Sequence, residues 1–200
     1  FSYVTEPKLD GLSVELVYRE RRLERGATRG DGREGEDITF NLRTVPEIPL
    51  ILPAHSSPPP FLVVRGELFM PKSGFHRVNA RRLEEGKEAF ANPRNAAAGT
   101  VRLLDSRETA QVPLDVFFYD ILAAEGELPE THRELLSALD RWGLKTNPLN
   151  RTVQQLQEIH DYYRFITESR EKLDYEIDGV VIKLNDLPLR GILGDRKSVV

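Results

Sequence analysis

The chain has 200 residues, of which 40% are hydrophobic and 30% charged, and its formal net charge is −4. Its apolar residues fall in short blocks between Gly, Pro and charged turns, which excludes a disordered chain, and no apolar stretch is long enough to span a bilayer. It contains no cysteine, which excludes disulfides and thiolate zinc sites, and its slightly acidic balance does not by itself indicate a nucleic-acid binder.

The first part of the chain predicts strands that pair with their sequence neighbours. A short strand breaks at a turn within residues 3–11, and alternating apolar and polar residues predict half-buried strands over 12–18 and 23–28. These three strands are expected to form an antiparallel meander. A glycine-containing loop over 30–35 then leads into a short helix over 36–43.

Helices and strands alternate in the rest of the chain. A strand is predicted over 61–70, and Pro71 suits the first turn of a helix that runs to about residue 85. The later predicted elements are a helix over 96–104 capped by the turn at 92–95, a strand over 114–122, a helix over 131–142, an amphipathic helix over 153–170 and a strand over 175–184. Antiparallel runs of strands with helices between them predict an α+β fold.

The tetrapeptide Lys8-Leu9-Asp10-Gly11 places a lysine at a strand end, just before a tight turn. An amine that attacks phosphorus must be neutral, and with an ordinary pKa near 10.4 only about 0.1% of it is neutral at pH 7.5, a handicap of about 4 kcal/mol. A nucleophilic lysine is therefore expected to need a partly dry, electropositive site. Taken alone, the tetrapeptide is also typical of a surface lysine in a turn.

Other charged residues on predicted strands make the functional interpretation stronger. Glu6 precedes Lys8 by two positions, so both side chains share one face of the strand. Glu67 lies in the middle of an apolar run, where a charge is costly to bury without a partner. Lys183 ends a strongly apolar strand, although a lysine there can also simply lay its stem along apolar surface. Together these side chains would line one cleft suited to a nucleotide phosphate and a ribose hydroxyl.

Several motifs resemble those of one enzyme family, in the same order. EPKLDG (residues 6–11) resembles the nucleophile motif of nucleotidyltransferases that form lysyl-AMP or lysyl-GMP. The longer strings resemble NAD-dependent DNA ligases of bacteria and are ATRGDG (27–32) with GEDIT (35–39), RGE (65–67), ANPRNAAAG (91–99) and DGVVIK (178–183). The resemblance extends to about residue 194, which covers nearly the whole chain.

The resemblance implies a role for individual residues. Lys8 would be the nucleophile that takes up AMP from NAD and displaces nicotinamide mononucleotide. Glu6 would contact the adenine end. The other implied nucleotide-binding residues are Arg29, Glu67 and Lys183. Supporting roles fall to Asp10 and Asp178 in positioning and electrostatics, and to Arg94, Arg102 and Arg170 near the DNA or the leaving group. For Arg94 and Arg102 the alternative is that the turn at 92–95 only caps a helix.

The resemblance also implies the wider biochemistry. The fold would be a nucleotidyltransferase core with antiparallel sheets flanked by helices. The parent enzyme would be a DNA ligase that seals nicked double-stranded DNA in replication and repair. It would use NAD and Mg²⁺ or Mn²⁺, with zinc only in a C-terminal domain outside this sequence, and no residue of this chain is assigned to a metal. We expect a monomer in the bacterial cytosol near the nucleoid, without membrane attachment.

The ends of the sequence carry two expectations. Residues 1–194 are expected to form an incomplete adenylation domain that does not seal nicks by itself. Residues 195–200 are expected not to be native protein, because they can be encoded by GATCGGAAGAGCGTCGTG, a common sequencing-adapter sequence.

Two alternative functions stay open at this stage. One is an ATP-dependent nucleotidyltransferase of the same superfamily, and the other is a non-catalytic module that binds nicks. A third possibility, a dinucleotide-binding fold suggested by G-x-G-x-x-G at residues 30–35, is disfavoured because that fold needs a parallel βαβ unit.

Two groups of residues are assigned no role in chemistry. The four histidines, which are His55, His76, His132 and His160, share no common spacing and are expected to be surface or capping residues. The aromatic residues of the late helix, Tyr162, Tyr163 and Phe165, are expected to be core and not a base-stacking platform.

Overall fold

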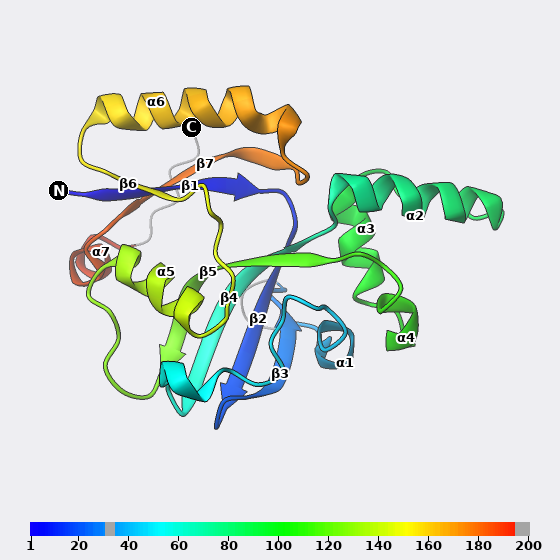
Figure 1. Cartoon of the computed structure of the whole chain (residues 1–200), viewed down its shortest axis with the longest axis horizontal. Coiled ribbons are helices and arrows are strands. Elements are labelled where there is room, and N and C mark those ends of the chain that lie inside the picture. The colour runs from blue at the N-terminus through cyan, green and yellow to red at the C-terminus, as the bar shows by residue number, and fades with distance from the viewer. Residues whose placement is uncertain (31–34, 195–200) are drawn as a thin grey trace.

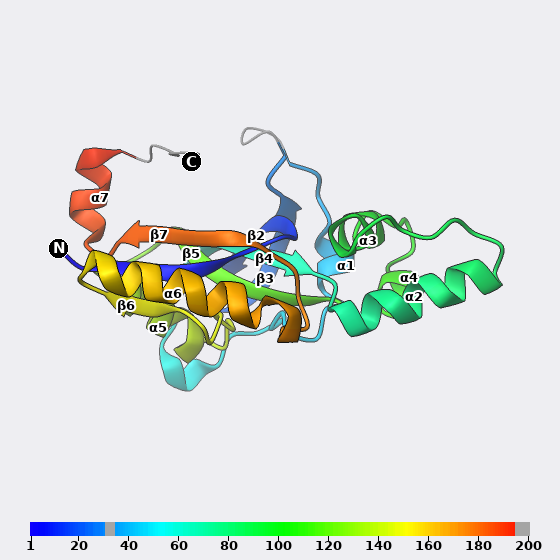
Figure 2. The same cartoon turned by 90° about the horizontal axis from the view of Figure 1, so that it is seen from above.

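A computed structural model describes residues 1–30 and 35–194 of the chain. Its strands form two sheets with helices around them (Figures 1 and 2). Every strand pair in the described part of the chain is antiparallel. The expected α+β architecture of antiparallel sheets flanked by helices is therefore confirmed, and a parallel dinucleotide-binding unit does not fit these strands.

The larger sheet, sheet B, has the strand order β3-β2-β4-β5 and holds the main core. Its strands are β2 (Leu12–Arg19), β3 (Arg22–Thr28), β4 (Phe61–Phe69) and β5 (Asp115–Ala124). Alternate residues of β2 and β4 point into the core. In β4 these residues include Leu62, Val64 and Leu68, which are completely buried. The helices α1 (Thr39–Leu42) and α5 (His132–Arg141) contribute buried leucines such as Leu42 and Leu139 to the same cluster.

The smaller sheet, sheet A, has the order β6-β1-β7 and carries helix α6 along it (Figure 2). It consists of β1 (Tyr3–Leu9), β6 (Arg151–Val153) and β7 (Ile177–Leu184). A small separate core, centred on Tyr162 and Ile166 of α6 (Leu156–Ser169), packs against this sheet. Tyr162 is thus a core residue as expected, whereas the neighbouring Tyr163 is 56% exposed.

The predicted meander of three strands is wrong in one respect. The hairpin of β2 with β3 forms as expected, but β1 pairs with β6 and β7 in the other sheet. Strand β6 ends at Val153, the residue at which the sequence predicted a helix to start, and α6 begins only at Leu156. Because β6 pairs only with residues 3–5, Pro7 of β1 faces a neighbour on one side alone, which suits a residue without a backbone N–H.

The predicted helices form with shifted ends, whereas short helical segments at 54–56, 106–109 and 187–193 were not predicted from the sequence. The remaining elements are a 3-10 turn η1 (Ala54–Ser56), α2 (Lys72–Glu84), α3 (Pro93–Thr100), α4 (Ser106–Thr109), η2 (Arg170–Lys172) and α7 (Leu187–Leu193). Helix α3 begins three residues earlier than predicted because Asn92 is its N-cap and accepts from the Asn95 backbone N–H at 2.8 Å. Helix α2 projects away from both sheets (Figures 1 and 2).

Two earlier expectations lie outside the described residues. The central part of the G-x-G-x-x-G motif falls at positions 31–34, and the predicted non-native tail covers 195–200. The origin of that tail stays a prediction.

Candidate functional site

Lys8 lies where β1 leaves sheet A. In the register of β1 with β7 it is opposite Gly179, and the register shifts between Lys8 and Leu9. Its Nζ donates a hydrogen bond to Oδ2 of Asp178, and its side chain is 51% exposed. The expectation of a dry, electropositive setting for this amine is therefore wrong for the described chain, since a carboxylate is its partner and water reaches it.

The glycine of the K-x-D-G motif lets the chain turn closely against β4. A Cβ on Gly11 would lie 2.3 Å from the backbone oxygen of Leu68 and 3.0 Å from Cγ of Glu67. This close approach allows the backbone N–H of Gly11 to donate to the Glu67 carboxylate. The turn after Lys8 thus packs directly against β4, the strand that carries Glu67.

Glu67 is partly buried, and its ionisation is unusual. Burial raises the pKa of Glu67 to about 7, and the hydrogen bond from Gly11 and the charges of Arg94 and Lys8 only partly oppose this effect. A carboxyl group with this pKa exists in both forms near neutral pH.

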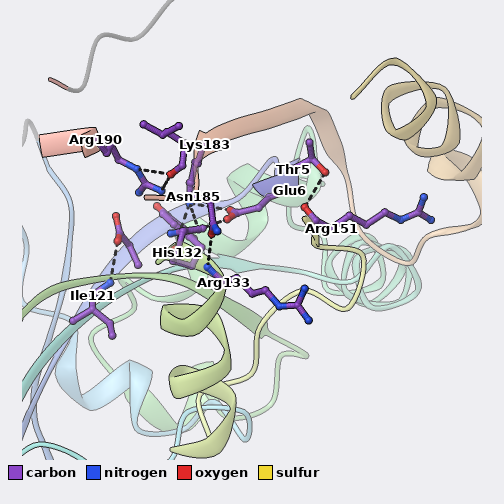
Figure 3. Close-up of polar contacts among 12 residues, drawn as sticks. Thr5, Glu6, Ile121, His132, Arg133, Arg151, Lys183, Asn185 and Arg190 are labelled. Carbon is purple, nitrogen blue, oxygen red and sulfur yellow. Dashed lines mark hydrogen bonds and ion pairs between the residues drawn. The ribbon is translucent and has the colours of Figure 1, made fainter. Parts of the chain in front are cut away.

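Glu6 and Lys183 form a partly buried ion pair between β1 and β7. Nζ of Lys183 donates to Oε2 of Glu6 at 2.9 Å (Figure 3). It also donates to the Tyr119 backbone oxygen at 3.3 Å. Burial alone would raise the pKa of Glu6, but a hydrogen bond from His132 and the charge of Lys183 together lower it below its ordinary range. Lys183 is thus a paired residue and not a strand-end lysine that extends into water.

His132 was expected at the surface or in a cap, and that expectation is wrong. Its side chain is fully buried, and Nε2 lies 2.5 Å from Oε1 of Glu6 and 3.3 Å from Nζ of Lys183 (Figure 3). Burial lowers the pKa of His132, and the positive charge of Lys183 acts in the same direction against the hydrogen bond with Glu6. The sequence carries no local signal for this burial, because a histidine directly after an N-cap residue such as Thr131 is typical of a surface turn.

Tyr119 of β5 connects the two halves of the site. Nζ of Lys183 lies 5.0 Å from the centre of the Tyr119 ring, and the tyrosine hydroxyl is 3.1 Å from Oγ of Ser13. Ser13 is opposite Glu67 in the pairing of β2 with β4. Burial raises the pKa of Tyr119 to about 12, so the ring stays neutral. Tyr119 therefore contacts Lys183 on one side and, on the other, Ser13, which pairs with Glu67 in the register of β2 with β4.

A surface hollow of about 310 Å³ lies beside the Lys8–Asp178 pair. Asp10, Asp178 and Arg170 line it, so three of the predicted supporting residues are brought together there. Arg94 lies nearby, because its Nη1 donates to Oδ1 of Asp10 at 3.1 Å. Lys8, Arg94 and Arg170 all lower the pKa of Asp178, the hydrogen bond from Lys8 most strongly.

The other two predicted arginines lie along the first hairpin and α3. Arg29 follows β3, and its backbone N–H donates to the Ser13 oxygen at 3.1 Å, so its exposed side chain starts near the Tyr119 contacts. Arg102 bonds Oε2 of Glu36 at 2.5 Å and the Ala98 backbone oxygen at 3.0 Å. Arg102 is thus directed to the segment before α1 and not to the hollow beside Lys8.

Two kinds of feature are absent from the described part of the chain. Within residues 1–30 and 35–194, no three His, Cys, Asp or Glu side chains gather into a group that could hold a metal ion. No helix in that same part of the chain has the length and apolar character needed to cross a membrane.

Comparison with known proteins gives one family and one fold. The family model described as NAD-dependent DNA ligase adenylation domain matches residues 1–198. The DNA ligase of Syntrophotalea carbinolica is 49% identical over 97% of the chain, and that of Geobacter sulfurreducens is 51% identical over 97%. The chain spans 29% of the length of each of these relatives. A solved structure of mycobacterial DNA ligase D complexed with ATP and MES has a TM-score of 0.53 at 15% identity, covering 92% of this chain and 49% of that one, which supports the fold alone.

Proposed function

Since the chain belongs to the family of NAD-dependent DNA ligase adenylation domains, we propose that Lys8 takes AMP from NAD. The Lys8 nitrogen attacks the α-phosphate, a phosphorus–nitrogen bond forms, and the bond to the nicotinamide mononucleotide half breaks as that half leaves. The AMP then passes to a 5′-phosphate of nicked DNA, and the 3′-hydroxyl displaces it to close the strand. The closing steps belong to the whole parent protein, in replication and repair.

The observation that carries the proposal is the ion pair of Lys8 with Asp178, a residue that lines the hollow together with Asp10 and Arg170. An ammonium group has no lone pair for attack, so Lys8 has to leave Asp178 and lose a proton before the bond forms. Until then the ion pair holds the amine at a fixed place on the turn. Glu67 offers two oxygens to ribose hydroxyls, and the charges of Arg94 and Arg170 suit the phosphates that leave.

The base is proposed to lie at the opposite end of the site. There Glu6 offers an acceptor and Lys183 a donor, next to the face of the Tyr119 ring. Arg29 would reach the nucleotide from the end of β3. Mg²⁺ or Mn²⁺ would stabilise charge on the phosphate oxygens and would be held mainly by the substrate, because the described residues include no group of three metal-binding side chains.

The partners and setting of the parent protein follow from the same proposal. Nicked duplex DNA is the second substrate, and its contacts with Arg94 and Arg102 would be to the phosphate backbone, independent of sequence and sensitive to salt. A monomer in the bacterial cytosol fits such a task.

Labelling of Lys8 tests the proposed reaction. The chain is incubated with NAD labelled in its adenylate half, with excess unlabelled ATP or NAD as competitor, and the modified residue is located by mass spectrometry. We expect AMP on Lys8 and competition by NAD but not by ATP.

The variant Lys8→Ala should lose the label completely. Lys145→Ala is the matched control, because Lys145 is also partly exposed and paired with a carboxylate, at 2.7 Å from Asp115, but lies elsewhere. Label retained in Lys8→Ala would rule out the proposed nucleophile. Competition by ATP alone would favour an ATP-dependent enzyme, and DNA binding without any label would favour the nick-binding module.

A further inference from the structure

His132 is a buried titratable residue that the proposed reaction does not use. Its Nε2 is 2.5 Å from Glu6, whereas its Nδ1 is buried and meets no hydrogen-bond partner among the described residues. Burying a polar ring to 0% exposure with one nitrogen unpaired costs free energy, which the contacts of Nε2 with Glu6 and Lys183 have to offset.

The position of His132 is fixed from two sides. On one side, the side chain of Thr131 caps α5 in a capping box with Glu134. On the other side, Asn185, which follows β7, accepts from the His132 backbone N–H at 2.7 Å through its own backbone oxygen. The Asn185 side chain accepts from the Arg133 backbone N–H at 3.0 Å (Figure 3). The start of α5 is thus attached to the strand that carries Lys183.

The surroundings of His132 favour one protonation state. A doubly protonated ring would bury an Nδ1–H without an acceptor, next to the positive charges of Lys183 and Arg190 and at the positive end of a helix. Only Glu6 favours that charged form. The neutral ring with its proton on Nε2 donates to Glu6 and leaves only a lone pair on Nδ1, which costs less.

With this proton on Nε2, Glu6 can act only as an acceptor. His132 occupies Oε1 and Lys183 occupies Oε2, while each oxygen keeps a further lone pair. Lys183, which also donates to the Tyr119 oxygen, keeps one N–H free for a ligand. The pair therefore presents an acceptor beside a donor. Adenine presents the complementary amino group beside a ring nitrogen acceptor, whereas a 6-oxo purine presents these two groups with the opposite polarity.

We propose that His132 is a positioning residue that holds Glu6 as an ionised acceptor and thereby makes the site select adenine over a 6-oxo purine. The inference rests on the proposed function, because it takes the base to lie beside Glu6. It adds to that function the residue that determines the choice of base.

Binding of AMP and of inosine monophosphate to the chain tests this inference by calorimetry. The unmodified chain should prefer AMP. His132→Phe keeps a ring of similar size but has no donor, so AMP should bind roughly 10- to 100-fold more weakly, with little change for inosine monophosphate. His132→Gln can place an N–H near the position of Nε2 and should restore most of the preference. Thermal unfolding of each variant shows whether it is folded.

The unmodified chain also provides a test that does not depend on any variant folding. Nitrogen-15 NMR of the histidine rings, with the His132 signals assigned from their loss in His132→Gln, should show a protonated Nε2 and an unprotonated Nδ1 near pH 7. A proton on Nδ1, or an unchanged AMP preference in a folded His132→Phe, would overturn the inference. If the unmodified chain labels Lys8 but binds both nucleotides equally, only the inference fails. If it neither labels Lys8 nor binds AMP, the proposed function fails with it.

Discussion

Glu67→Gln is expected to be more stable than the unmodified chain, and the difference in free energy of unfolding should grow as the pH rises. Burial raises the pKa of Glu67 to about 7 in the folded chain, from an ordinary value of 4.5. Between these values the folded state keeps a proton that the unfolded state has lost, so Glu67 lowers the free energy of unfolding progressively from about pH 4.5 to pH 7. Above pH 7 this loss in free energy of unfolding reaches at most about 3 kcal/mol. Because the side chain is only partly buried, solvent screening should reduce the effect to about 1–2 kcal/mol at pH 8.

Glutamine has the right shape for this comparison, because its side-chain oxygen can still accept from the Gly11 N–H but cannot ionise. The free energy of unfolding would be measured by urea denaturation, followed by circular dichroism, at pH values from 5 to 8.5. Glu127→Gln is the control, since Glu127 is exposed in the loop between β5 and α5. A stability difference between Glu67→Gln and the unmodified chain that stays constant with pH, or that favours the unmodified chain at pH 8, would refute the reasoning.

Three further substitutions have expected outcomes. Gly11→Ala should lower the free energy of unfolding by about 1–3 kcal/mol and abolish labelling of Lys8, because the new Cβ overlaps the Leu68 oxygen. An unchanged free energy of unfolding with unchanged labelling would contradict this close approach. Asp178→Asn should change stability by less than about 1 kcal/mol, since its ion pair is exposed, yet slow labelling of Lys8 at least about tenfold; an equal rate would show that the pair does not position the amine. Thr131→Ala should lower the stability measured by thermal unfolding by about 1 kcal/mol, and Thr131→Ser should keep the stability of the unmodified chain. Equal stability of all three chains would show that the cap contributes nothing.

The sequence predicted which elements exist better than it predicted which elements pair. Alternation of apolar and polar residues located β2, β3 and β4 within a residue or two, because one face of each strand is buried in the main core. The same alternation says nothing about the partner of a strand. Strand β1 was therefore assigned to its sequence neighbours, although its partners are β6 and β7.

Prediction of the site had a similar limit. The K-x-D-G motif and the strand positions of Glu6 and Lys183 could be identified from spacing, and these two residues do meet across β1 and β7. His132 could not, because a lone histidine after a cap residue is typical of a surface turn. Only tertiary packing buries its ring against Glu6. The ion pair of Lys8 with Asp178 was also missed, since a pair of residues 170 positions apart has no local pattern.

The pairing of β1 also has a consequence for synthesis on the ribosome. The partners of this strand are made about 150 to 180 residues later, as the contacts of Thr5 with Arg151 and of Glu6 with Lys183 show. At roughly 5–20 residues per second, the strand waits on the order of 10–30 s while the hairpin of β2 and β3 and then β4 can already associate. A waiting strand is open to wrong pairing with other chains, and charged side chains reduce that risk. Glu6 and Lys8 would thus protect the nascent strand well before either of them meets a nucleotide.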